Sequence, residues 1–404
     1  MSRLRLTSGV YLVDGYVASC IYDLREEFAK IYWLDAECRG LVRQHMAGVS
    51  LAASLPDVIG AIVNLGLASI GDGASSPDLP AVTRGQPIIH AWIEITERCQ
   101  LRCIYCYGKF GGGGNNARTM TVSEADFVLA WLQSSDIRSV QIIGGEPFVN
   151  RDVTRHLVRG LHAQGMSVEI YTNGLRLEKD DADFLSAHGV RLAVSIFGAT
   201  EAEAAAVTGY ANTFREQMRT VKMLEAHEVS VRYSITRTVS NSGSSAKDIS
   251  AIFGIHGGVA IREDIARPVG RATDENIVGN KLDRMTYINK GYFSRKIKSS
   301  TVKNNISGHS CLMRKICIST SMDVYPCTME RSISYGNIRF DTALDIERAS
   351  VDYRFASKDK IDICSLCEYR YACFDCPPRR PGGFYSKPTI CLYDPHASAW
   401  REEP

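Results

Sequence analysis

The chain has 404 residues, of which 45% are hydrophobic, so it can bury a sizeable core in two or three domains without disulfides. Its 47 basic and 45 acidic residues give a formal net charge of +2, which argues against nucleic acid as a partner. The sequence contains no apolar run of about 18 residues and no signal-peptide pattern, so we expect a cytoplasmic protein without a membrane partner. In that reducing compartment, 13 cysteines favour metal binding or catalysis over disulfides.

The first part of the chain, residues 1–72, is expected to form a small separate domain. Its predicted elements are strands at Gly9–Val13 and Ser19–Tyr22 and a helix near Leu34–Met46. A second helix is predicted from apolar residues that share one helix face, namely Leu55, Val58, Ile59, Ile62 and Val63. The stretch Gly71–Gly85 is rich in Gly, Ser, Pro and Asp, and we assign residues 73–87 to a linker.

Strands and helices alternate over residues 88–300. The predicted strands are Ile88–Thr96, Ser139–Gly144, Ser167–Thr172, Arg191–Phe197, Val229–Thr236 and Gly258–Ile265. Thr121 with Glu124, and Thr213 with Glu216, fit the capping box that begins a helix. This alternation implies parallel strands with right-handed crossovers. The sequence therefore predicts an α/β partial (β/α)6 barrel, whose chemistry would lie at the C-terminal ends of the strands.

Three cysteines, Cys99, Cys103 and Cys106, form a C-x3-C-x2-C loop directly after the first predicted strand of this region. Three close thiolates can hold three corners of a 4Fe–4S cube and leave the fourth iron open, whereas most clusters are closed by four cysteines. The alternatives are a zinc site or ordinary buried thiols. The run Gly111–Gly114 that follows is either a mobile flap or, more simply, a flexible loop.

The cysteine loop, followed by Tyr107 and Gly108, resembles that of the radical S-adenosylmethionine (SAM) family. The resemblance implies that the three cysteines bind a catalytic 4Fe–4S cluster whose open iron chelates the amino and carboxylate groups of SAM. It also implies cleavage of SAM to methionine and a 5′-deoxyadenosyl radical that abstracts hydrogen from a substrate. By the same resemblance, Tyr105 offers backbone contacts to the adenine of SAM.

Further SAM contacts are implied at the ends of the next strands. Gly144-Gly145-Glu146-Pro147 ends the second strand, and the family uses this element for the amino group of SAM, with the proline shaping the turn. Asn173 ends the third strand and is either a SAM contact or a strand-end turn residue. Ser195 in the fourth strand is implied to contact the ribose, although Phe197 stands where many relatives have an acidic residue. Thr208-Gly209 resembles a stretch that some relatives use near SAM.

The last part of the chain, residues 301–404, is dense in cysteines. Eight of them could form two four-cysteine sites, and zinc is the physical rival of iron there. The spacing resembles the SPASM domain, which holds two auxiliary 4Fe–4S clusters. The resemblance assigns the first cluster to Cys311, Cys317, Cys327 and Cys376, and the second to Cys364, Cys367, Cys373 and Cys391. The two remaining cysteines, Cys20 and Cys38, are expected to be ordinary buried thiols.

Three further features bear on the substrate. Relatives that mature sulfatases carry an Asp base directly after the cysteine at the position of Cys327, and this chain has Thr328, which disfavours formylglycine formation. Arg267 and Arg271 either grip a carboxylate of SAM or substrate or take part in a salt bridge. Residues 1–72 loosely resemble winged-helix domains that add a leader peptide as a strand at a sheet edge. A structural extension is the alternative.

These features predict a radical SAM and SPASM maturase of a ribosomally synthesised peptide. It would use SAM and three 4Fe–4S clusters, with a leader-bearing precursor peptide and an electron donor such as flavodoxin or ferredoxin as partners. We expect an oxidative crosslink, preferably a C–C cyclophane, with thioether and ether bonds as alternatives. The other hypotheses are modification of another protein or a small molecule, sulfatase maturation included, and a non-catalytic iron–sulfur scaffold.

Overall fold

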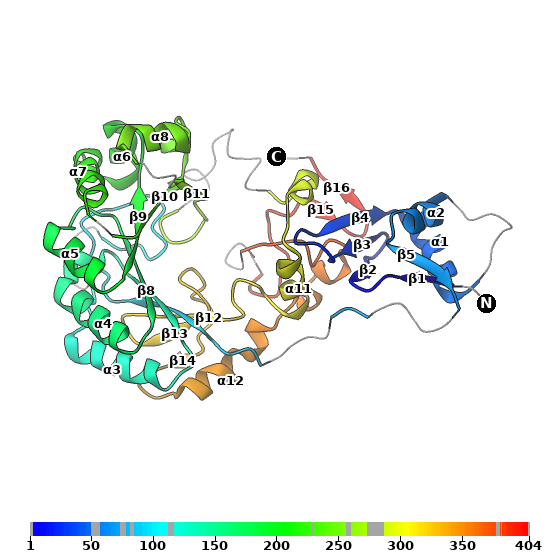
Figure 1. Ribbon diagram of the computed structural model, residues 1–404, viewed down its shortest axis with the longest axis horizontal. Helices are drawn as coiled ribbons and strands as arrows, with labels where there is room; N and C mark the ends of the chain where they lie inside the picture. The colour runs from blue at the N-terminus through cyan, green and yellow to red at the C-terminus, as the bar shows by residue number, and fades with distance from the viewer. Residues whose placement is uncertain are drawn as a thin grey trace. The chain divides into compact units, whose positions relative to one another are not determined.

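The computed structural model describes residues 3–49, 57–72, 78–80, 85–111, 117–227, 229–255, 260–272, 287–376, 380 and 382–402. The chain forms two compact units (Figure 1). The sheet unit comprises Gln86–Thr286 and Arg314–Val351, and the terminal unit comprises Met1–Gly85, Tyr287–Met313 and Asp352–Pro404. None of the helices in the described ranges has the length and apolar character that crossing a membrane requires.

The sheet unit is built on nine strands in the order β11-β10-β9-β8-β7-β6-β12-β13-β14. They are β6 (His90–Glu94), β7 (Ser139–Ile143), β8 (Ser167–Thr172), β9 (Arg191–Ile196), β10 (Val231–Arg237), β11 (Arg262–Ile265), β12 (Lys315–Ile318), β13 (Asp323–Tyr325) and β14 (Gly336–Asn337). Strands β6 to β11 run parallel in chain order, which confirms the predicted α/β fold. The extension was not predicted: β12 adds parallel to β6, and β13 and β14 follow antiparallel.

Helices follow the parallel strands along the outside of this sheet (Figure 1). They are α3 (Val122–Gln133), α4 (Arg151–Ala163), α5 (Lys179–Ala187), α6 (Glu201–Thr208), α7 (Thr213–Glu225), α8 (Ala246–Phe253) and α12 (Ala343–Arg354), with the short η1 (Pro147–Asn150) and η2 (Val239–Asn241). The capping box of Thr121 and Glu124 is confirmed at α3. The one predicted at Thr213 is wrong, because Asn212 is the N-cap of α7 and Glu216 instead accepts a hydrogen bond from a tyrosine hydroxyl.

The two faces of the parallel strands differ in polarity. Ile93, Ile142 and Ile170 share one register row, and all three are fully buried. Gln141 and Glu169 lie in the neighbouring row, whose side chains point to the opposite face because strand residues alternate. The polar face is the one that can carry a site at its C-terminal edge.

The terminal unit contains the N-terminal elements. They are β1 (Arg3–Leu6), β2 (Val10–Asp14), β3 (Ser19–Asp23), β4 (Lys30–Leu34), α1 (Ala36–Ala47), α2 (Asp57–Asn64) and β5 (Ala68–Gly71). Both predicted strands and both predicted helices are present, although Leu55 lies outside the described residues. Strands β2, β3 and β4 form an antiparallel meander, and β1 pairs with β5, which ends at Gly71, just before the predicted linker of residues 73–87.

The later segments of the terminal unit pack against this meander. They form η3 (Lys290–Ser294), α11 (Ser299–Ser307), η4 (Lys358–Lys360), η5 (Cys364–Leu366), β15 (Tyr393–Asp394) and β16 (Ala399–Trp400). One face of the N-terminal strands packs on Val42 of α1 and Ile59 of α2. Tyr22 of β3 instead shares a second core with Tyr369 and Tyr393. The meander and the C-terminal cysteine segment are therefore parts of one packed body.

Candidate active site

The cysteine loop follows β6 without regular secondary structure, and the end of α6 holds its middle. Arg102 N–H donates to the carbonyl of Thr208 at 2.8 Å, and Ile104 N–H donates to that of Val207 at 2.9 Å. These carbonyls lie in the last turn of α6, where backbone acceptors have no partner inside the helix. The stretch around Thr208-Gly209 thus positions the loop through its backbone.

A second clamp on the loop comes from Arg271. Its Nε donates to the carbonyl of Cys103 at 2.9 Å, its guanidinium also donates to the carbonyl of Phe110, and its own N–H donates to that of Cys106 at 3.0 Å. Gly270 has a φ of +70°, and a Cβ there would lie 2.2 Å from the carbonyl oxygen of Cys106. Arg271 therefore braces the cysteine loop, and its observed partners are carbonyl oxygens where a carboxylate was expected.

The three thiols of the loop influence one another. Burial raises the pKa of Cys99 to about 12, with contributions from the nearby charges of Glu146 and Cys106. Burial also raises the pKa of Cys103 well above its ordinary value, with added contributions from Cys99 and Cys106. Because metal ligands must be thiolates, binding iron here would release protons.

A cluster and a single metal ion place different demands on these side chains. Within the described ranges, no group of three or more His, Cys, Asp or Glu residues is arranged to hold one metal ion. Ligands of a mononuclear zinc site converge on one point. The thiolates of an iron–sulfur cube each bind a different iron, so they surround a volume instead.

The glycine turn after β7 packs on the start of the cysteine loop. Gly145 N–H donates to the carbonyl of Thr96 at 2.7 Å, and Glu146 N–H donates to that of Arg98 at 2.9 Å. A Cβ on Gly144 would lie 2.5 Å from the Thr96 oxygen, and one on Gly145 would lie 2.2 Å from the Arg98 oxygen. Only glycine permits this approach, so the turn and the loop are fixed together.

Glu146 is fully buried, and its carboxylate binds groups of the protein itself. It accepts hydrogen bonds from the Thr172 hydroxyl at 2.7 Å, Asn173 N–H at 2.8 Å and Phe148 N–H at 3.1 Å. Burial raises its pKa to about 7. Pro147 follows as the first residue of η1. The side chain thus fixes the end of β8, and its contact with SAM stays a prediction.

Asn173 and Ser195 lie on neighbouring strand ends. The Asn173 amide donates to Cys99 Sγ at 3.8 Å, and its oxygen accepts from Gln100 Nε2 at 2.9 Å. Ser195 is half-buried in β9, and its carbonyl accepts a hydrogen bond from Gln217, which also donates to the carbonyl of Asn173 at 3.3 Å. The structure brings Asn173 directly to the first cysteine.

Two aromatic side chains of the predicted SAM site pack into apolar surroundings. Tyr105 packs against the buried Ala266 and Ala272. Phe197 is buried in a small core with Leu101, which lies inside the cysteine loop. The Phe197 ring has no hydrogen-bonding group for a ribose, and the backbone contact of Tyr105 with adenine stays a prediction.

A buried polar cluster beside the loop was not predicted. Glu94 ends β6 and accepts hydrogen bonds from the Tyr107 hydroxyl at 3.0 Å and from the Arg331 guanidinium. Arg331 Nε donates to the carbonyl of Thr328 at 2.9 Å. Burial raises the pKa of Glu94. An acidic residue at the C-terminal end of a parallel strand was the sequence pattern that could have indicated this site.

The second auxiliary set of cysteines lines one cavity of the terminal unit. Cys364, Cys367, Cys373 and Cys391 all border it. Burial raises the pKa of Cys364 to about 11 and also raises that of Cys373. Four thiols around one cavity are the donor set that a closed iron–sulfur cluster requires. The residues therefore fit the group that the sequence pattern implied.

The first auxiliary set has two members in each unit. Cys317 is buried in β12, opposite Tyr325 of β13, and Cys327 follows two residues later. Glu330 N–H donates to Cys327 Sγ at 3.3 Å. The other two cysteines, 311 and 376, belong to the terminal unit. Their joint role as ligands stays a prediction.

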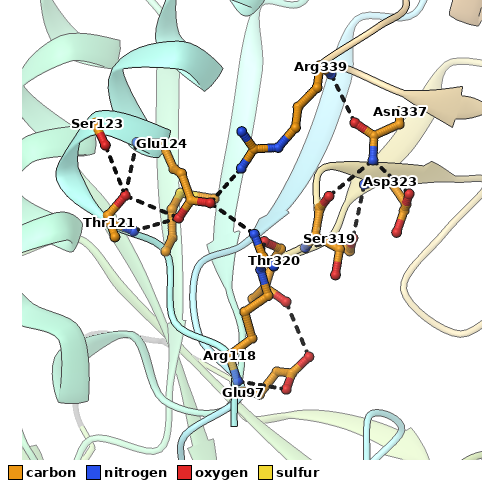
Figure 2. A network of polar contacts seen from close by, with 12 residues as sticks. Glu97, Arg118, Thr121, Ser123, Glu124, Ser319, Thr320, Asp323, Asn337 and Arg339 are labelled. Carbon is orange, nitrogen blue, oxygen red and sulfur yellow. Dashed lines mark hydrogen bonds and ion pairs between the residues drawn. The ribbon is translucent and has the colours of Figure 1, made fainter. Parts of the chain in front are cut away.

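A polar network ties the start of the cysteine loop to the β12–β13 hairpin (Figure 2). Arg118 N–H donates to Glu97 Oε2 at 3.0 Å, and Arg118 Nε donates to the carbonyl of Thr320 at 2.7 Å. The Thr320 hydroxyl donates to Glu97 Oε1 at 3.2 Å. The carboxylate of Glu124 in α3 forms ion pairs with Arg118 at 2.9 Å and with Arg339 at 2.5 Å. Residues just before the first cysteine are thus fixed to the hairpin that carries Cys317.

Known sequences match the part of the chain that contains this site. Residues 93–252 match the model of the Radical SAM superfamily. The GTP 3′,8-cyclase of Caulobacter vibrioides is 30% identical over 114 residues, which is 26% of this chain and 32% of that protein. The probable GTP 3′,8-cyclase of Methanococcus vannielii is 30% identical over 112 residues, 28% of this chain and 37% of that protein. The chain thus spans about a third of the length of these curated relatives.

Solved structures share the fold over a larger part of the chain. Streptococcus suis SuiB bound to precursor peptide SuiA has a TM-score of 0.56 and 13% identity, covering 96% of this chain and 99% of SuiB. Native anSMEcpe with bound AdoMet has a TM-score of 0.56 and 13% identity, covering 76% of this chain and 94% of that protein. The family match and these similarities define an α/β radical SAM fold, with a radical SAM domain over residues 93–252.

Proposed function

We propose that this protein is a radical SAM maturase that installs an oxidative side-chain crosslink in a ribosomally synthesised precursor peptide. The observation that carries the proposal is the pairing of a braced three-cysteine loop with a separate cavity lined by four further cysteines. The first fits a cluster with an open iron, and the second fits a closed one. When bound, the open cluster would supply the electron that cleaves SAM and generates a hydrogen-abstracting radical.

The hydrogen count of a crosslink explains why such an enzyme needs more than one redox group. Joining two side-chain atoms removes two hydrogens from the peptide. One leaves as a hydrogen atom to the radical derived from SAM, and the other leaves as a proton together with one electron. The cysteines outside the SAM loop, Cys364, Cys367, Cys373 and Cys391 among them, are the residues we assign to the acceptor of that electron.

The chain's own residues would orient the reacting groups. Arg271 and the end of α6 hold the cysteine loop, and Asn173 contacts its first thiol. Groups held in this way keep the reacting atoms in a fixed geometry between substrate binding and reaction. Glu94, bound to Arg331, lies at the C-terminal end of its strand, where the proposed substrate would enter.

The edge of β4 supports a peptide substrate. Ala29 N–H donates to the carbonyl of Ile297 at 2.8 Å, so it faces away from β3. Because backbone groups alternate along a strand, the N–H groups of Ile31 and Trp33 face the same way. In the described part of the chain, no backbone acceptor reaches either of them. A leader peptide can therefore add to this edge as a further strand, and SuiB, which shares this fold, binds a precursor peptide.

Two other enzymatic hypotheses remain for comparison. The fold is shared with anSMEcpe, but Thr328 follows Cys327 here, so the chain lacks the Asp base expected for formylglycine formation. The sequence matches to GTP 3′,8-cyclases favour a small-molecule substrate, but they cover about a third of those proteins. The edge of β4, where a leader peptide could add as a strand, supports the peptide over a small molecule.

Two assays test the proposal. The anaerobically reconstituted protein, supplied with dithionite and SAM, should release 5′-deoxyadenosine, and the Cys103→Ala variant should not. If a short open reading frame neighbours the gene for this chain, co-expression with the peptide that it encodes should give a peptide lighter by two hydrogens per crosslink. If deoxyadenosine is released with GTP as substrate and the peptide mass is unchanged, the substrate is a small molecule and the peptide proposal is wrong.

A further inference from the structure

Lys358, the first residue of η4, lies between two cavities of the terminal unit. One is the cavity lined by the second set of cysteines, which Arg370 and Lys387 also border. The other is lined by Asp375 and Arg380. Lys358 borders both cavities, and so does Cys373. The lysine therefore stands between a pocket of thiols and a buried carboxylate.

The buried charges around Lys358 do not balance. Its Nζ lies 2.5 Å from Asp375 Oδ1, and Arg380 Nε lies 2.7 Å from Asp375 Oδ2. The side chains of Asp375 and Arg380 are fully buried, and that of Lys358 is 9% exposed. Two cations thus share one carboxylate and leave one excess positive charge in the interior. An uncompensated buried charge is costly, so an anionic partner is expected nearby.

The other charged groups around the thiol cavity do not cancel this excess. Arg370 Nε is paired with Asp359 at 2.7 Å. Lys387 Nζ donates to the carbonyl of Tyr393 at 2.6 Å, which is a neutral partner. Glu368, next to Cys367, is fully buried and accepts hydrogen bonds from tryptophan and tyrosine side chains. Among these described groups, the single carboxylate of Glu368 stands against two positive charges, namely the excess charge beside Asp375 and that of Lys387. The surroundings of the thiol cavity therefore stay net positive.

We propose that Lys358 and its pair with Asp375 set the reduction potential of the cluster that Cys364, Cys367, Cys373 and Cys391 would bind. This inference rests on the proposed function. A cluster closed by four thiolates is anionic, and it gains one negative charge when it takes up the electron left on the peptide. A fixed ammonium beside the cavity stabilises the reduced form more than the oxidised form, which raises the potential. Lys358 is a positioning residue in this sense and touches no substrate.

The test uses the full-length protein in a simplified background. Cys→Ser substitutions at positions 99, 103, 106, 317 and 327 leave only the second auxiliary set intact. After reconstitution with iron and sulfide, this parent should bind ~4 irons per chain. An EPR-monitored redox titration then gives the midpoint potential of that cluster alone. The variants are Lys358→Met, Lys358→Arg and, as a matched control, Lys360→Met, since Lys360 is an exposed residue of the same short helix.

We expect Lys358→Met to lower the equilibrium constant for reduction roughly tenfold, which is about 59 mV for one electron. Lys358→Arg and Lys360→Met should keep the parent value. If Lys358→Met fails to assemble the cluster, Asp375→Asn decides instead. It removes the anion and should shift the constant roughly tenfold in the opposite direction. If the parent binds ~4 irons and the Lys358 and Asp375 variants have the same midpoint potential as the parent, the proposed role of Lys358 is wrong and the cluster assignment is retained. A parent that binds no iron would overturn both.

Discussion

Arg271 offers a quantitative test of how the cysteine loop is held. Its guanidinium donates to the carbonyls of Cys103 and Phe110, and both bonds are lost in Arg271→Met. A hydrogen bond from a charged group contributes about 1.5–3 kcal/mol, and the lower end applies because this side chain is half-buried and water can replace it. Because both bonds come from one guanidinium and such contributions are not additive, we expect the loop to lose about 2 kcal/mol of local stability.

A loss of that size should raise the open population of the loop about 30-fold. Hydrogen–deuterium exchange of peptides spanning residues 99–110 measures this directly in the protein before reconstitution. Arg267→Met is the matched control, since Arg267 lies four residues before Arg271 and, among the described residues, its side chain donates to the carbonyl of Ile265 at 3.2 Å and not to the cysteine loop. Equal protection of residues 99–110 in both variants would refute the proposal that Arg271 braces the loop.

Three further predictions follow from other parts of the molecule. Because burial raises the pKa of Glu146 to about 7 from the usual 4.5, the folded state binds its proton more tightly than the unfolded chain does. Stability from this group is therefore full below about pH 4.5 and falls by up to ~3 kcal/mol as pH rises to about 7, a slope that urea unfolding should show in the wild type and not in Glu146→Gln. Ile31→Pro removes an outward N–H of β4 and should weaken leader binding about tenfold in fluorescence anisotropy, whereas Ile31→Val should bind normally. Cys364→Ser should lower the iron content by ~4 per chain without abolishing reductive SAM cleavage, and unchanged iron would remove this cysteine from the ligand set.

The strand–helix region was predictable because its sequence pattern is local. Strands such as β7 and β9 are short and rich in apolar residues, and α3 carries its own capping signal in Thr121 and Glu124. The extension by β12 to β14 was not predictable in this way. These strands are two to four residues long, and β12 depends on pairing with β6, more than 200 residues earlier in the chain. Such pairing leaves almost no local pattern.

The candidate site was likewise predictable where it depends on neighbouring residues in the sequence, and not where it depends on residues far apart in the chain. The spacing of Cys99, Cys103 and Cys106 marked the loop, but the groups that hold it come from α6 and from Arg271, whose roles depend on tertiary contacts. The salt bridge of Glu94 with Arg331 joins residues far apart in sequence, so no local pattern contained it. The sequence of β3 likewise did not reveal that Tyr22 packs beside the C-terminal cysteine segment.

That shared core affects how the leader hypothesis should be tested. Removing the N-terminal region would expose Tyr369 and Tyr393, whose core includes Tyr22 of β3. A truncated chain would then lose stability around the cysteine cavity as well as any peptide site. Point variants on the edge of β4 disturb this core less than a truncation does, because Ile31 packs only against its margin and Tyr22 stays in place.

The measurement that tests the central claim most directly is the iron and sulfide content per chain after anaerobic reconstitution. A radical SAM maturase with two auxiliary clusters should hold ~12 irons per chain and an equal amount of sulfide. A value near ~4, especially together with bound zinc, would mean that the C-terminal cysteines are structural. The proposal of an oxidative crosslink would then be contradicted, since the chain would lack an acceptor for the second electron.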